Sequence, residues 1–139
     1  MGMTLKRRSI KSVGSSNALT RAGEKIAPSA ITATVDGLTT GLITDSMGFV
    51  VVTSGNAAHI ITLPAAVPGI TIEGWISTTG VVMRTPAASN VKINNVDADG
   101  TNSLTIAVGE TFRAICVATT EWKVQRWTIA GAAAAAVPA

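Results

Sequence analysis

The chain is 139 residues long, 47% hydrophobic and only 14% charged, a balance that excludes a polar or acidic disordered protein. This length makes one domain, or two only if both are very small. The single cysteine and single histidine exclude a disulfide framework and multi-cysteine or histidine-rich metal centres, and no apolar stretch reaches the ~20 residues of a membrane-spanning helix.

Positive charge is concentrated at the N-terminus. Six basic residues against one acid give the first 25 residues a formal charge of +5, whereas five basic residues against seven acids leave the remainder at −2. This layout suits a cationic arm that docks onto an acidic partner surface. A nucleic-acid or nuclear-localisation patch and a solvated terminus are the alternatives, while residues 9–20 lack the apolar run of a signal peptide. The six cations are Lys6, Arg7, Arg8, Lys11, Arg21 and Lys25.

We assign residues 1–40 to an extended basic N-terminal arm. They are rich in Ser, Thr, Ala and Gly, and only 31–35 carry a faint strand pattern. Such a composition cannot bury enough apolar surface to offset the entropy of ordering. We therefore expect the first 30 or so residues to be disordered in the free protein and ordered on an assembled particle.

The body, residues 41–130, has a hydrophobic period of two, which predicts strands. The β-branched segment 48–53 is typical of a strand buried on both faces. Segment 59–63 ends at Pro64, and 70–76 places isoleucines on one face and Trp75 on the other. In 103–108, Leu104, Ile106 and Val108 share a face. Further strands are expected at 81–85, 91–93, 111–117 and 121–129.

Two details of the body concern its turns and its last strand. Gly55, Gly80, Gly100 and Gly109 stand in turns where a positive φ would be free of Cβ strain. In 121–129 the alternation changes parity between Val124 and Trp127. Either a β-bulge near Gln125 or a strand packed on both sides explains this change.

About eight strands at roughly ten-residue spacing, with no helical segment between them, predict an all-β fold. We expect an antiparallel β-sandwich, β-tulip or small barrel. The Ala-rich tail, residues 131–139, is too short for a stable isolated helix and is expected to be extended or frayed, with a neighbour as one possible contact.

Candidate chemistry is sparse. Asp97, Asp99 and Asn102 could supply oxygen ligands to calcium, but the spacing fails the EF-hand template, and a hairpin turn is favoured. His59 has no nucleophile at a defined spacing, and Cys116 is interpreted as a small buried hydrophobe. No phosphate-binding glycine motif occurs. Trp122, Lys123, Arg126 and Trp127 are interpreted as a core strand with solvated charges rather than a base-stacking platform. We therefore expect no enzyme activity, metal or cofactor.

The apolar content exceeds what one small core can hide, since roughly 25% charged residues is normal for a globular domain. Self-association is the economical explanation. Trp75, which shares a strand with inward isoleucines but lies on the opposite face, is the candidate interface residue. A second layer of the same domain that covers Trp75 is the alternative.

Several short motifs follow one another in a recognisable order: 60–66 (IITLPAA), 68–69 (PG), 93–97 (INNVD), 109–114 (GETFRA) and 120–124 (TEWKV). Over residues 45–130 this order resembles capsid decoration (cement) proteins of tailed bacteriophages and related β-modules of tail appendages. The resemblance implies a β-sandwich or β-tulip body, trimeric clustering and an N-terminal arm laid on the major capsid protein. The arm here is longer and more basic than that pattern requires.

The resemblance implies two candidate functions. The first is a structural virion protein that decorates and stabilises the outer surface of a phage capsid by binding the major capsid protein through its arm. The second is a tail-fibre or spike module that binds host-surface glycans. The loops consist mainly of Gly, Ala, Ser, Thr and Asn and offer little surface for stacking on sugars. We therefore favour the capsid protein, as a homotrimer without nucleic-acid or membrane partners.

Overall fold

The computed structural model describes residues 27–100 and 102–139. This part of the chain is built from strands, and its one helical element is a single 3-10 turn, η2 (Thr39–Gly41). None of the described residues form a helix long and apolar enough to cross a membrane. The strands are β1 (Ser29–Thr32), β2 (Phe49–Thr53), β3 (Ile60–Thr62), β4 (Thr71–Ile76), β5 (Val81–Arg84), β6 (Lys92–Ile93), β7 (Val96–Asp97), β8 (Leu104–Ile106), β9 (Thr111–Ala118), β10 (Glu121–Trp127) and β11 (Ala133–Ala134).

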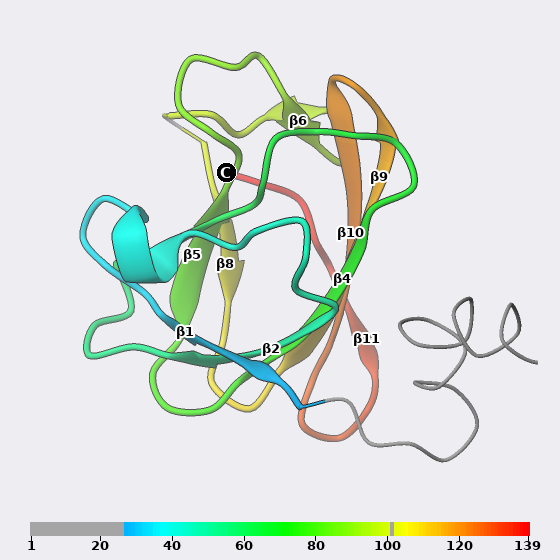
Figure 1. The fold of residues 1–139 in the computed structure, drawn as a ribbon. Helices are drawn as coiled ribbons and strands as arrows, with labels where there is room; N and C mark the ends of the chain where they lie inside the picture. Colours follow the sequence, from blue (N-terminus) through cyan, green and yellow to red (C-terminus); the bar gives the residue numbers. More distant parts are fainter. Residues whose placement is uncertain (1–26, 101) are drawn as a thin grey trace, which may run out of the picture.

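The strands form two sheets, and the predicted all-β fold is confirmed. The larger sheet has the order β1-β2-β4-β9-β10-β6-β7, with β11 paired to β10, and the smaller has the order β3-β5-β8. In Figure 1, β5 and β8 lie on one side of the molecule and β4, β9 and β10 on the other. Backbone bridges from Thr34 to Ile60 and from Leu42 to Thr62 join the edges of the two sheets along one side.

The sheets are mixed, so the expectation of antiparallel pairing is only partly correct. Strand β1 runs parallel to β2, and β2 runs parallel to β4, as do β3 with β5 and β6 with β10. For β2 with β4 and for β3 with β5 the cause is that the chain alternates between the sheets from β2 to β5, so each return enters its sheet in the original direction. The tight β9–β10 and β6–β7 connections give antiparallel pairs.

The core lies between the sheets and is almost entirely aliphatic. Its largest side chains are Trp122 and Phe112, both 1% exposed or less. Alternate residues of β4 point inward, so Ile72, Gly74 and Ile76 are buried and the residues between them are exposed, as the period-two pattern predicted. The same alternation leaves one whole face of the larger sheet turned away from the core.

Two expectations about strand faces are wrong. Strand β2 is not buried on both sides, because Phe49 is 38% exposed and Val51 is half-buried. It lies within a sheet whose outer side has no covering layer among the described residues. The strand 103–108 ends at Ile106, so Val108 leaves the shared face and is 47% exposed.

The turn and bulge expectations are met in part. Of the four turn glycines, only Gly109 has a positive φ, at 80°. The β9–β10 ladder runs without interruption from Trp122 to Trp127, and its register shift lies between Glu121 and Trp122 rather than near Gln125. The hydrophobic residues of β10 therefore change parity without a bulge. Trp122 and Val124 point into the core, whereas Trp127 points outward and is half-buried.

The ends of the body extend further than the sequence indicated. Residues assigned to the arm form β1, and Ile31 and Ala33 enter the core at 2% and 3% exposure. The boundary at residue 40 is therefore wrong, and the body begins by Ser29. The tail is extended as expected, yet it packs on its own chain: β11 pairs with β10, and Ala139 and Ser103 exchange two backbone hydrogen bonds.

Candidate functional site: the outer face of the large sheet

The face of the larger sheet that is turned away from the core carries most of the chain's aromatic side chains. We call it the outer face, and its aromatic residues are Phe49 on β2, Trp75 on β4 and Trp127 on β10. Phe49 and Trp75 are 38% and 41% exposed, and Trp127 is half-buried. The strand register places Trp75 beside Thr111 and Thr111 beside Trp127, so the backbones of the two tryptophans are two strand spacings apart, about 10 Å.

An ion pair lies in the neighbouring row of this face. Glu73 on β4 stands directly opposite Arg113 on β9, with Oε1 and Nε 3.5 Å apart. The side chains are 50% and 47% exposed, so the pair contributes at most about 1 kcal/mol to stability. Its larger effect is that the two opposite charges cancel at the centre of the outer face.

A shallow hollow of about 310 Å³ crosses these two rows. Phe49 and Trp127 line its two ends, and Glu73, Arg113 and Thr111 lie between them; backbone atoms of β4 and β9 at Gly74 and Phe112 complete it. Trp75 does not line this hollow. The arrangement combines two aromatic walls with one acceptor, one donor and one hydroxyl group on a continuous sheet.

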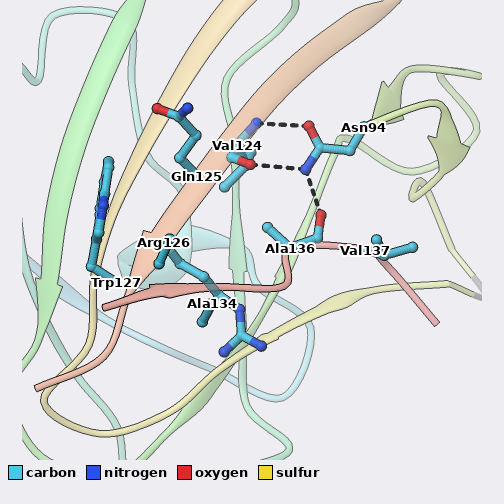
Figure 2. Close-up of a pocket in the computed structure, with 9 residues that line it drawn as sticks. Asn94, Val124, Gln125, Arg126, Trp127, Ala134, Ala136 and Val137 are labelled. Atoms are coloured by element: carbon cyan, nitrogen blue, oxygen red, sulfur yellow. Dashed lines mark hydrogen bonds between the residues drawn. The ribbon is translucent and has the colours of Figure 1, made fainter. Parts of the chain in front are cut away.

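A second hollow, of about 290 Å³, lies beside β10 under the C-terminal tail. Figure 2 shows Asn94 on one side of β10, bonded to Val124 and Ala136, with Gln125 and Trp127 on the other side. The Asn94 Nδ2 donates to the carbonyls of Val124, at 2.8 Å, and Ala136, while its Oδ1 accepts the Val124 N–H at 3.0 Å.

Asn94 thereby completes the edge of β10. Strand β6 pairs with β10 at Glu121 and Trp122, and β11 pairs with it at Arg126 and Trp127. The Asn94 amide satisfies the backbone of Val124 between these two short partners, as a strand residue would. Edge strands with unpaired backbone groups promote association. Because Asn94 already bonds the N–H and C=O of Val124, this part of the β10 edge offers no free backbone groups to another chain.

The predicted site residues are placed as follows. Trp75 is on the outer face and exposed, as expected for an interface residue. The six arm cations Lys6, Arg7, Arg8, Lys11, Arg21 and Lys25 lie outside the described residues, so their contacts and the predicted disorder stay predictions.

The weaker candidates have local structural roles. The Asp99 carboxylate accepts the Asn90 N–H at 2.8 Å, and that of Asp97 accepts the Asp99 N–H at 3.3 Å. No group of three potential metal ligands of the His, Cys, Asp and Glu types occurs within residues 27–100 and 102–139. Cys116 is 1% exposed and its pKa is raised by burial, which agrees with a buried hydrophobe.

Sequence reasoning missed Phe49, Trp127, the Glu73–Arg113 pair and Asn94. The alternation of β2 contained a signal for Phe49, because Val50 and Val52 are the inward residues and Phe49 has the opposite parity. The Glu73–Arg113 pair joins strands 40 residues apart, and no local pattern reports it. Comparison with known proteins adds no assignment: no family model, no curated protein and no solved structure matches the chain.

Proposed function

We propose that this protein is a structural virion protein that decorates the outer surface of a phage capsid. Its basic N-terminal arm binds the major capsid protein, and its β-body stabilises the shell by bridging subunits. The observation that supports the proposal is the division of charge: six cations against one acid in the first 25 residues, and a net charge of −2 on the rest.

The arm acts through several weak contacts at once. An exposed ion pair contributes about 0–1 kcal/mol, so one or two cations cannot hold a protein on a particle. Six cations facing an acidic surface, together with backbone pairing to a capsid strand, supply a sufficient total. The acidic body gains nothing from the same surface, and it therefore projects away from the shell.

Copies of the body associate with one another, and we expect a homotrimer with Trp75 at the contact. Ten large hydrophobic side chains of the described body are exposed, and association between copies would remove some of this apolar surface from water. They are Val35, Leu38, Leu42, Phe49, Val67, Trp75, Val108, Val117, Ile129 and Val137. Replacement of Trp75 by Ser should lower the sedimentation coefficient, whereas Val137→Ser should not.

The test is the occupancy of purified capsids by three proteins: the full chain, a deletion of residues 1–25, and a full-length variant in which the six arm cations are replaced by Gln. We expect the two altered proteins to keep the melting curve of the body and to lose occupancy. Occupancy of the intact chain should also fall as salt rises, because salt screens the charges. Equal occupancy by all three proteins would refute the arm mechanism, and antibody labelling of the tail instead of the head would refute the location.

A further inference from the structure

We propose that the outer-face hollow between Phe49 and Trp127 binds a neutral saccharide. This site is separate from the arm that the proposed function uses, and Trp75, the expected contact between copies, does not line the hollow. The inference rests on the shape of the hollow, the chemistry of its lining and its balance of charge.

The two ends of the hollow are aromatic. Phe49 and Trp127 stand on strands β2 and β10, which are three strand spacings apart in the sheet order, or about 14 Å between backbones. The hollow that they bound has a volume of about 310 Å³, at the lower end of the range of small-molecule sites. Aromatic surfaces bury the apolar C–H faces of such rings at a low entropy cost, because each side chain has only two rotatable bonds.

The groups between the aromatic walls match sugar hydroxyls, which both donate and accept hydrogen bonds. Glu73 offers an acceptor, Arg113 offers several donors, and the Thr111 hydroxyl offers both. Within the described residues, the polar contact of Glu73 and Arg113 is with each other, at 3.5 Å. Most of their hydrogen-bonding capacity is therefore available to a ligand.

The charge of the hollow selects against other ligands. Glu73 and Arg113 are its only charged lining residues, and their charges cancel. Single-stranded nucleic acid also stacks on aromatic side chains, but its phosphates need uncompensated positive charge beside them. A neutral saccharide has no such requirement.

The hollow is also preorganised. Its lining residues come from four adjacent strands, and the central pairs β4–β9 and β9–β10 are the longest ladders of the protein. A rigid platform loses little conformational entropy when it binds, which favours recognition by a small number of contacts.

The test is a titration of the full-length protein with maltotetraose, cellotetraose and chitotetraose, followed by tryptophan fluorescence and calorimetry. We expect saturable binding of at least one of them, with an affinity at least tenfold weaker in Phe49→Ala and in Trp127→Ala. The matched control is Val117→Ala, an exposed hydrophobic residue on β9 outside the hollow, and its affinity should equal that of the parent. Melting curves of all variants verify folding, and Phe49→Ala decides the matter if Trp127→Ala does not fold.

Three results would overturn the proposal. One is the absence of saturable binding to all three sugars at concentrations up to about 10 mM, which is beyond any specific site of this size. Another is stronger binding of oligo(dT) than of any sugar, with loss in the same variants. The third is a change of sedimentation coefficient in Phe49→Ala, which would assign the hollow to a second copy of the chain. None of these results depends on the arm or on capsid occupancy.

Discussion

The contact between Gly74 and Phe112 offers a sharp test of how the core is packed. Gly74 lies in the middle of β4 and faces inward. A Cβ atom at this position would lie 2.4 Å from both Cε1 and Cζ of Phe112 and 2.8 Å from a methyl of Val50. Phe112 and Val50 are at most 1% exposed, so neither side chain can move into solvent. We therefore predict that Gly74→Ala destabilises the body by overpacking.

Two opposing contributions set the magnitude. Replacement of Gly by Ala in a compatible backbone stabilises a protein by about 0.4–1 kcal/mol through the unfolded state. Extra methyl groups in a well-packed core cost about 1–3 kcal/mol. Contacts this short with the buried ring of the cross-strand partner Phe112 fall at the upper end of that range. The net loss is about 2 kcal/mol, which lowers the Tm by about 8–10 °C for a body of this size.

Thermal and urea unfolding of Gly74→Ala and three further variants measures the effect. Gly48→Ala is the matched control, since a Cβ there meets nothing within 4 Å, and its stability should equal or slightly exceed that of the parent. Phe112→Leu removes the atoms that clash, so the double variant Gly74→Ala/Phe112→Leu should lose less stability than the sum of the two single changes. If Gly74→Ala is as stable as Gly48→Ala, the packing argument is wrong.

The remaining predictions concern the tail, the thiol and a carboxylate. Asn94→Gly should speed hydrogen exchange at Val124 and in β11, because glycine accepts the positive φ of 51° at this position but lacks the side-chain bonds to Val124 and Ala136. Unchanged exchange would contradict the closure of the β10 edge. Burial raises the pKa of Cys116 above its ordinary 9.0, so a thiol reagent at neutral pH should modify it only after denaturation. Burial alone would raise the pKa of Glu121, but hydrogen bonds from Lys123 and the Asn95 N–H, with the charges of Lys123 and Lys92, lower it below 4.5. This stabilisation is present above about pH 4.5 and is lost as the pH falls through the lowered pKa; acid unfolding of Glu121→Gln should depend less steeply on pH in that range.

Alternation along the sequence was sufficient to place most strands and to assign their inward faces. In β4 and β9 the buried residues follow every second position, because successive side chains of a strand point to opposite sides. The Asn94–Asn95 pair likewise marks the β6–β7 hairpin, where both residues have positive φ as a two-residue turn requires. Side-chain alternation and turn conformation are local properties, so they can be predicted without knowing which strands are neighbours in the sheet.

Strand partners and the outer-face site were decided by the tertiary structure. Whether β2 is covered on one side or on both depends on which layer packs against it, and Phe49, Glu73, Arg113 and Trp127 meet only because β2, β4, β9 and β10 are adjacent in the sheet. The parallel pairs β2–β4 and β3–β5 also depend on tertiary structure, because they arise from a chain that alternates between two sheets. Period-two patterning specifies which face of a strand is buried, but the order of strands is settled by the packing of the whole core, to which residues distant in sequence contribute together.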